Sequence, residues 1–367
     1  MITLLMPTMN RPIHVRRALE YYKKIGIPAR LIILDSSSKI IKEENQITIK
    51  DLTTTDFAPL YIECEETISY MEKIVKGLSS IYTPYVALAA DDDFFSAQGL
   101  HEAANFLRDN QDYLFAQGHW LGFTYDTNIT WYDVGVLDNI RSFDQKDSLE
   151  RVRDFLQKNT IIFYSLFRVD AFVDIMKKSC KYAQCGKFFE CLYILFTLMR
   201  GRGKLLEIPY LYREMMEHSM GRQLQRSWML GSEFNIAIQK FSAGIADGLV
   251  SYCGFNREKS LTQSKIMKDQ FLDLVLKTSF SYEKVELPSL TRRLARTFIS
   301  RSKRDYLLHL SSKYKSIIKT FFNNKYFRDY FSRDPYKKEI AFIEQQIKQS
   351  NAPACMFDTS MFTRIFL

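Results

Sequence analysis

Short apolar runs that each end in a polar cluster are the feature that most constrains this chain. Residues 2–6 (ITLLM) lead into PTMNRP, residues 30–34 (RLIIL) lead into DSSS, and residues 84–90 (PYVALAA) lead into DDD. Apolar runs of this length, bounded by turn residues, are typical of buried strands. A stretch with helical spacing separates the first two runs, which predicts a strand–helix–strand unit with parallel strands.

The same alternation continues for another eighty residues. We expect a weaker strand at 60–63, helices at 66–79 and 97–109, and a further strand at 113–117. In sheets of this kind the carboxyl ends of the parallel strands meet at one edge, where ligands bind. The sequence therefore predicts an α/β fold with a mostly parallel, Rossmann-like sheet flanked by helices.

Beyond residue 120 the strand pattern weakens and then gives way to helices. We expect helices over 168–200, a turn at Arg200–Lys204 and a strand in the ten residues that follow. From residue 256 onward the pattern is helical, with few strand signals. We therefore predict two domains, an α/β domain over 1–255 and a basic α-helical C-terminal domain over 256–367.

Composition excludes several other classes of protein. The 367 residues are 46% hydrophobic and 25% charged, which is ordinary for a globular protein and excludes a disordered or collagen-like chain. Six cysteines without a CxxC pair or zinc-ligand spacing predict reduced thiols. The N-terminus lacks the pattern of a secretion signal, and no run of about 18 apolar residues predicts a membrane span. The net charge of +9 favours anionic partners.

Three adjacent carboxylates, Asp91, Asp92 and Asp93, follow the apolar run at 84–90. Like charges this close repel one another, so they need solvent or a cation. Hard oxygen ligands in a compact cluster suit Mg²⁺ or Mn²⁺, which can bridge a diphosphate. The alternative is a solvated acidic loop that caps the helix at 97–109, because carboxylates favour helix N-termini.

Two other polar clusters end the first and second apolar runs. The loop that contains Pro7, Thr8, Asn10 and Arg11 can hold a nucleotide base and ribose, with the arginine on a phosphate; an ordinary strand-to-helix turn is the alternative. Asp35 and Ser36 can accept from a base N–H or a ribose hydroxyl, or can form a turn or helix cap.

Taken together, these clusters resemble a known family. The pattern TxNRPxxVxRAL, then a strand ending in Asp-Ser, then a strand ending in an acidic DxD cluster, is similar to the GT-A nucleotide-sugar glycosyltransferases of family 2. Further along, Phe188–Glu190, the Gly-Lys turn before 205 and the strand with Tyr212-Arg213 resemble the family's later motifs. The resemblance covers residues 1–225 and implies a GT-A fold.

The resemblance also implies roles for individual residues. The donor nucleotide would be bound by Pro7, Thr8, Asn10, Arg11, Asp35, Ser36, Asp91 and Asp92. A Mn²⁺ or Mg²⁺ ion would be held by Asp91 and Asp93, with His218 as a further ligand. Glu190 would be the general base that deprotonates the acceptor hydroxyl. The family usually has Glu-Asp at this point and this chain has Glu190-Cys191, so the base is either Glu190 or another residue.

Three more side chains are candidates for contact with sugar. His119 follows the strand at 113–117, and Trp120 and Tyr164 offer aromatic faces that can stack on sugar rings. Core packing is the commoner use of aromatic residues, and it stays an alternative for both.

The C-terminal part is strongly basic. Residues 289–338 contain 14 Lys and Arg residues against 3 Asp and Glu, and an apolar helical stripe runs through them. Such a segment either binds an anionic membrane surface or packs its stripe on the rest of the chain.

These observations predict a metal-dependent glycosyltransferase that moves a sugar from a nucleotide-sugar donor, with a UDP-sugar favoured, to a glycan or lipid-linked acceptor. The family's habits imply bacterial surface polysaccharide or glycoconjugate synthesis, a cytoplasmic location that can include peripheral contact with the inner membrane, and a possible homo-oligomer. The alternatives are a nucleotidyltransferase, a basic nucleic-acid-binding protein and an inactive scaffold. The loop PTMNRP lacks glycine, which disfavours the first, and no nucleic-acid-binding motif supports the second.

Overall fold

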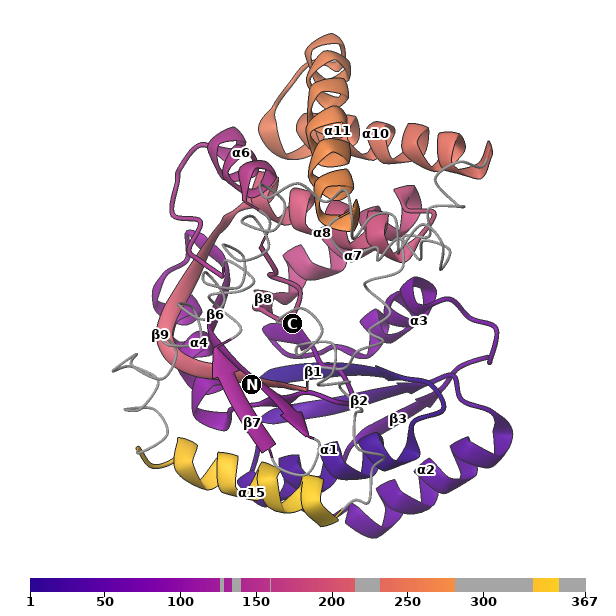
Figure 1. The fold of residues 1–367 in the computed structure, drawn as a ribbon, viewed down its shortest axis with the longest axis vertical. Coiled ribbons are helices and arrows are strands. Elements are labelled where there is room, and N and C mark those ends of the chain that lie inside the picture. The colour runs from indigo at the N-terminus through magenta and orange to yellow at the C-terminus, as the bar shows by residue number, and fades with distance from the viewer. Residues whose placement is uncertain (126–128, 134–139, 159, 215–231, 281–332, 350–367) are drawn as a thin grey trace, which may run out of the picture.

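A mixed sheet with helices on both faces forms the body of the protein (Figure 1). The computed structural model describes residues 1–125, 129–133, 140–158, 160–214, 232–280 and 333–349. Within these ranges the strands follow the order β3-β2-β1-β4-β8-β6-β9-β5, with β7 paired to β6. The pairings make β1, β2, β3, β4, β6 and β9 run in one direction. The predicted α/β class and mostly parallel sheet are confirmed.

The first half of the sheet is built as the alternation of apolar runs predicts. Its elements are β1 (Ile2–Thr8), α1 (Pro12–Ile25), β2 (Ala29–Asp35), α2 (Lys39–Leu52), β3 (Leu60–Glu63), α3 (Tyr70–Gly77), a 3₁₀ turn (Leu78–Ser80) and β4 (Tyr85–Leu88). Pro12 starts α1, where its missing N–H is not needed, and Gly26 ends it with a φ of 62°. The helix α2 was missing from the prediction.

The second half adds two long strands and a helical layer. Its elements are β5 (Phe94–Phe95), α4 (Ala97–Asp109), β6 (Tyr113–Tyr125), β7 (Ile129–Asp133), α6 (Ser148–Gln157), β8 (Leu166–Arg168), α7 (Val169–Tyr182), α8 (Gly186–Arg200) and β9 (Arg202–Glu214). Because β9 already begins at Arg202, the expected turn at Arg200–Lys204 is wrong for Arg202, Gly203 and Lys204.

Two apolar clusters pack on the two faces of the sheet, as the pleat of the strands requires. Along β1, Leu5 belongs to the cluster shared with α3, α7 and α8, whereas Leu4 and Met6 belong to the cluster shared with α1 and α4. Side chains of successive strand residues therefore anchor helices on opposite faces. This holds the carboxyl end of β1 in a fixed position.

The described C-terminal helices pack on the same two clusters. α10 (Ser232–Cys253) and α11 (Arg257–Phe280) contribute Phe241 and Phe271 to the cluster with α8. α15 (Tyr336–Gln349) returns to α1 and contributes Ile343 to the other cluster. The division at residue 255 stays a prediction, but helices on both sides of it share one core. No helix in the described part of the chain has the length and apolar character needed to cross a bilayer.

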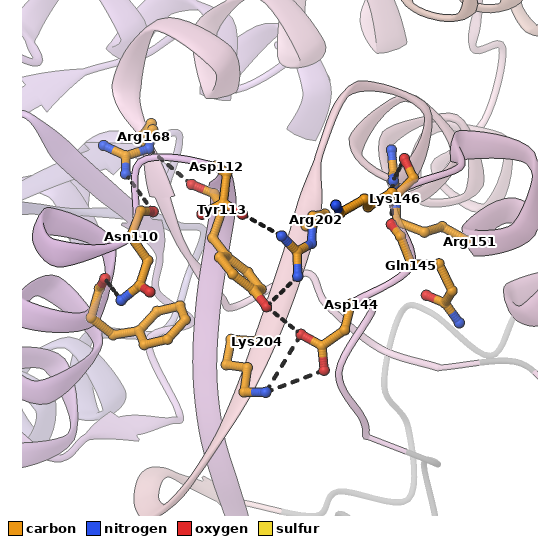
Figure 2. Close-up of polar contacts among 11 residues, drawn as sticks. Asn110, Asp112, Tyr113, Asp144, Gln145, Lys146, Arg151, Arg168, Arg202 and Lys204 are labelled. Carbon is orange, nitrogen blue, oxygen red and sulfur yellow. Dashed lines mark hydrogen bonds and ion pairs between the residues drawn. The ribbon is translucent and has the colours of Figure 1, made fainter.

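A polar network joins the starts of β6 and β9 to the segment before α6 (Figure 2). Arg202 binds Asp112 and donates to the Tyr113 hydroxyl over 2.7 Å, and that hydroxyl donates to Asp144 over 2.6 Å. Lys204 Nζ lies 3.2 Å from the same Asp144 carboxylate. These contacts lie at the amino ends of the two strands, so they fix the sheet at the end away from the polar clusters that follow β1, β2 and β4.

Candidate functional site

The polar clusters after β1, β2 and β4 meet at one edge of the sheet. Thr8 lies directly opposite Asp35 across the β1–β2 pairing, and β4 pairs with the other side of β1. The Thr8 hydroxyl donates to Asp91 Oδ2 over 2.6 Å, and both side chains are buried. The carboxyl edge therefore brings together residues about 80 positions apart in the sequence, as the parallel order predicts.

Arg11, in the loop between β1 and α1, binds two members of the acidic triplet. Its Nη1 lies 2.6 Å from Asp91 Oδ1 and its Nη2 lies 3.0 Å from Asp92 Oδ2. Burial raises the pKa of Asp91 to about 6, although the charge of Arg11 opposes that rise. Burial of Arg11 acts to lower its pKa, but the negative charges of Asp92 and Asp91 have the larger combined effect, so the pKa of Arg11 is raised. This guanidinium is the main partner of the triplet's first two carboxylates.

Asp93 points to a different partner. Its Oδ1 accepts the backbone N–H of Glu214 at the end of β9 over 3.0 Å, and burial raises its pKa well above the usual range. Glu214 in turn forms an ion pair with Arg17 of α1, and Arg17 is only 1% exposed. The sequence prediction gave no site role to Arg17 or Glu214, because a buried ion pair between residues 197 positions apart leaves no local pattern.

The arrangement of the triplet decides how well it fits a metal ion. Within the described residues, no three His, Cys, Asp or Glu side chains form a group that could hold one. Asp91 and Asp92 face Arg11, whereas Asp93 faces a backbone N–H. His218 lies outside the described residues. The Mn²⁺ or Mg²⁺ site predicted at Asp91, Asp93 and His218 therefore stays a prediction, and we derive no step through a metal.

The loop after β1 is held by hydrogen bonds to the segment that follows β2. Asn10 has a φ of 55°, its backbone N–H donates to Ser37 Oγ over 2.7 Å, and its Oδ1 accepts from Ser38 N over 2.9 Å. Asparagine tolerates this left-handed conformation better than most residues. Pro7 lies within β1 and is buried, so it belongs to the strand rather than to the loop. Arg11 and Thr8 are the members of this segment that reach the acidic triplet.

Asp35 is fully buried and already satisfied by protein donors. Its Oδ1 accepts from Ser37 N over 2.7 Å, and its Oδ2 accepts from Asn45 Nδ2 and the Tyr61 hydroxyl, each over 2.8 Å. Asn45 is on α2, the helix missing from the prediction. Asp35 therefore holds β2, β3 and α2 together at the site's edge, which adds a structural task to the predicted base or ribose contact.

Lys73 of α3 lies beneath the same edge and was also missing from the prediction. Its Nζ donates to the Thr8 carbonyl over 2.7 Å and to Ser36 Oγ over 2.6 Å. The side chain is 4% exposed, and burial lowers its pKa, with Cys64, Asp35 and Asp91 acting in the opposite direction. The predicted residues Thr8 and Ser36 are thus tied together by a buried ammonium group.

Glu190, the predicted general base, lies on α8. Burial raises the pKa of Tyr70, and the charges of Glu190, Asp91 and Asp92 raise it further. Glu190 Oε2 lies 3.2 Å from Lys187 Nζ, one helical turn away. Glu190 is partly exposed, and its neighbour Cys191 is buried in the core. The predicted base therefore forms an ion pair on its own helix, and its catalytic role stays a prediction.

The three predicted sugar-contact residues have different surroundings. Trp120 has no exposed surface and belongs to the core, where its ring centroid lies 5.5 Å from that of Tyr164. Tyr164 is half-buried, and Asp93 and Asp92 contribute to the rise of its pKa that burial causes. His119 pairs with Glu207 over 3.0 Å. Of the three, Tyr164 is the one that the structure brings to the triplet.

Arg213 completes this side of the site. Its guanidinium carbon lies 5.8 Å from the Trp120 ring centroid and 6.0 Å from that of Tyr164. Its charge acts against the rise of the Asp93 pKa. The motif Tyr212-Arg213 was noted in the sequence, but only the structure places this arginine beside the acidic triplet.

Comparison with known proteins gives a fold relationship. No family model and no curated protein matches the chain. The structure of S. aureus TarS 1–349 in complex with UDP-GlcNAc matches with a TM-score of 0.54 and 13% identity, over 78% of this chain and 76% of that one. TarS 1–349 with UDP gives 0.49 and 12%, over 78% and 76%. The mannosyltransferase PcManGT from Pyrobaculum calidifontis, in complex with GDP-Man and Mn²⁺, gives 0.41 and 9%, over 97% and 87%.

The first of these matches carries the structural argument. Its TM-score shows that this chain has the fold of the GT-A-type glycosyltransferases. The GT-A fold implied by the sequence resemblance is therefore confirmed.

Proposed function

We propose that this chain is a glycosyltransferase that takes a sugar from a nucleotide-sugar donor and transfers it to a hydroxyl group of a glycan or glycolipid. The observation that carries the proposal is the convergence of Thr8, Arg11 and Asp91 at the carboxyl edge of a GT-A sheet. Open α/β sheets bind ligands at this edge. The fold alone does not determine an activity, so the proposal rests on this site.

The charges at the site support a nucleoside diphosphate as the donor's anionic part. Arg11, Arg17 and Arg213 all act on the carboxylates of the triplet, and Lys73 lies beneath Thr8. Cations of this kind bind phosphate oxygens by charge-assisted hydrogen bonds. A structure of TarS contains UDP-GlcNAc, which supports testing a UDP-sugar first. A role for Mn²⁺ or Mg²⁺ stays a prediction from the triplet's residue types.

Glu190 is the proposed general base. Its carboxylate would accept the proton of the acceptor hydroxyl while the hydroxyl oxygen forms a bond to the anomeric carbon. The bond from that carbon to the nucleoside diphosphate breaks, and the diphosphate leaves with the electron pair. Support for this placement comes from the family resemblance and from the partly exposed position of Glu190 on α8, a helix that packs against α3.

The proposal also includes an acceptor and a cellular setting. A lipid-linked or polysaccharide acceptor, a cytoplasmic location and contact with an anionic membrane all follow from the basic segment 289–338 and the family resemblance. Residues 289–332 lie outside the described ranges. Homo-oligomer formation likewise stays a prediction.

The proposal is tested by incubating the full chain with UDP-, GDP-, dTDP- and CMP-sugars and measuring nucleotide release. We expect release from one nucleotide class, and we expect Glu190→Gln to slow it about 10²–10⁴-fold with donor affinity retained, as for a lost general base. Glu44→Gln, at an exposed glutamate of α2, is the matched control. No release from any of the four classes in the presence of crude glycan and lipid acceptors, with Mn²⁺ supplied, would overturn the proposal.

A further inference from the structure

The helix α15 lies more than 200 residues after the acidic triplet in the sequence. In the fold it packs beside α1, the helix that begins directly after Arg11. In Figure 1, α15 lies along α1, the helix that follows Arg11 and carries Arg17. Ile343 and Ile347 of α15 are buried in the cluster that contains α1, and the rings of Phe342 and Tyr21 stack with centroids 6.2 Å apart. The helix is therefore firmly anchored on this face of the sheet.

A carboxylate of this helix is buried where two site-bearing segments meet. Glu339 is 4% exposed, its Oε2 accepts from the Tyr212 hydroxyl over 2.7 Å, and its Oε1 accepts from Ala97 N over 3.0 Å. Ser96, the residue before Ala97, caps α4 by accepting from Gly99 N over 3.1 Å. Burying a carboxylate is costly unless hydrogen-bond donors satisfy it. Here one donor is on β9 and the other is at the start of α4, directly after β5.

Strands β5 and β9 also hold the second half of the acidic site. Tyr212 of β9 pairs directly with Phe94 of β5. Asp93 lies one residue before Phe94 and Glu214 two residues after Tyr212, and the N–H of Glu214 donates to Asp93 Oδ1 over 3.0 Å. Glu339 therefore holds both sides of the β5–β9 pairing two to four residues from Asp93 and Glu214.

We infer that Glu339 is a positioning residue for the proposed donor site, acting through Tyr212 and the start of α4 on Asp93 and Glu214. That this site binds a donor rests on the proposed function, whereas the contacts from Glu339 through Tyr212 and Ala97 toward Asp93 and Glu214 do not depend on it. Glu339 does not touch the site itself. It fixes the separation of β5 and β9, and with it the direction in which the Asp93 carboxylate and the Arg213 side chain point.

Amide hydrogen exchange on the full chain tests the link without requiring activity. Glu339→Gln and the milder Tyr212→Phe should speed exchange of the Glu214 amide about tenfold or more, because local opening of this pairing becomes easier. Exchange in β1 and β2 should stay unchanged, which separates a local effect from general destabilisation. Tyr212→Phe removes one hydroxyl, so it stays informative if Glu339→Gln fails to fold.

Glu344→Gln is the matched control on the same helix. Glu344 accepts from Trp131 Nε1 over 2.9 Å and so anchors α15 to β7. The Trp131 ring packs on Tyr212 with centroids 6.0 Å apart, but removing the Glu344 carboxylate leaves the hydrogen bonds of Glu339 to Tyr212 and Ala97 in place. We expect it to leave exchange of the Glu214 amide unchanged. Equal effects of Glu344→Gln and Glu339→Gln, or no effect of Glu339→Gln and Tyr212→Phe, would overturn the inference.

Binding of UDP as a probe gives the second measurement. At a temperature where all variants are folded, Glu339→Gln and Tyr212→Phe should weaken UDP binding about tenfold, and Glu344→Gln should not. If the wild-type chain binds no nucleotide, the proposed function fails while the exchange result still decides the role of Glu339. If UDP binds and the variants bind it as the wild type does, the positioning role is wrong.

Discussion

The guanidinium of Arg11 lies 2.6 Å from Asp91 Oδ1, so the residue that precedes α1 is joined directly to the acidic triplet that follows β4. Arg11 also reaches Asp92 over 3.0 Å. A single cation thus offsets part of the negative charge of Asp91 and Asp92. Any anionic ligand at this edge meets a site whose negative charge is already partly balanced.

Arg11→Ala should destabilise the free protein by leaving buried Asp91 with the Thr8 hydroxyl as its main partner. We expect the free energy of unfolding at pH 7.5 to fall by about 1.5–3 kcal/mol, the range for a hydrogen bond to a charged group. Urea unfolding measures the change. Arg16→Ala is the control, because Arg16 is exposed and donates only to Thr48 among the contacts described for it. Equal losses in the two variants would contradict a special role for Arg11.

The buried ion pair of Arg17 and Glu214 should show strong coupling. Removing one partner leaves an uncompensated buried charge, so Arg17→Met and Glu214→Gln should each cost about 3–5 kcal/mol. The double variant should cost less than the sum, because no lone charge remains. A double-mutant cycle by urea unfolding measures this coupling. Additive losses would show that the two side chains act independently.

His14, on the first turns of α1, should make the protein less stable in acid. Burial, with Arg11 and Arg17, lowers its pKa to about 3, whereas the unfolded chain has a pKa near 6.5. Its stabilising contribution is therefore complete above pH 6.5 and is lost as the pH falls toward 3. When the pH falls from 7 to 5, we expect the free energy of unfolding of the wild type to decrease by about 1–2 kcal/mol more than that of His14→Gln. Urea unfolding at each pH measures the difference.

The comparison with His14→Gln is needed because buried carboxylates with a raised pKa make the protein more stable, not less, as the pH falls. Burial raises the pKa of Asp91 to about 6, so ionising it costs stability as the pH rises. Both proteins share that effect, and it cancels in the difference. His101→Gln, at an exposed position of α4, serves as a second control. Parallel pH curves for wild type and His14→Gln would contradict the lowered pKa.

The sequence predicted the sheet and its ligand-binding edge because both depend on local patterns. Apolar runs that end in PTMNR and DDD identify buried parallel strands, and parallel strands place their carboxyl ends together. This is enough to bring Thr8, Arg11 and Asp91 into one site. The same reasoning identified β9 near Tyr212 but began it too late, because its first residues include two polar side chains and Gly203.

Other parts depend on contacts that have no local signature. The helix α2 begins with KIIKEENQ, whose polar face obscures its period, yet its Asn45 reaches Asp35. The Arg17–Glu214 pair and the contact of Glu339 with Tyr212 link residues far apart in the chain. The triplet was expected to bind a metal, and no local pattern indicated that Asp93 would also accept the backbone N–H of Glu214.

Nucleotide binding measured by thermal shift tests the central claim most directly. The full chain is heated with UDP, GDP, CMP, TDP and ADP, each with Mn²⁺ and again with EDTA, beside an Arg11→Ala variant. We predict that one nucleotide stabilises the wild type, by about 2.7 kcal/mol at a hundredfold excess over Kd, and stabilises Arg11→Ala much less. Loss of the effect in EDTA would assign the triplet a metal, whereas its persistence would leave Arg11 as the cation at the site. If no nucleotide stabilises the wild type under either condition, the donor site proposed at the edge of β1 and β4 does not exist.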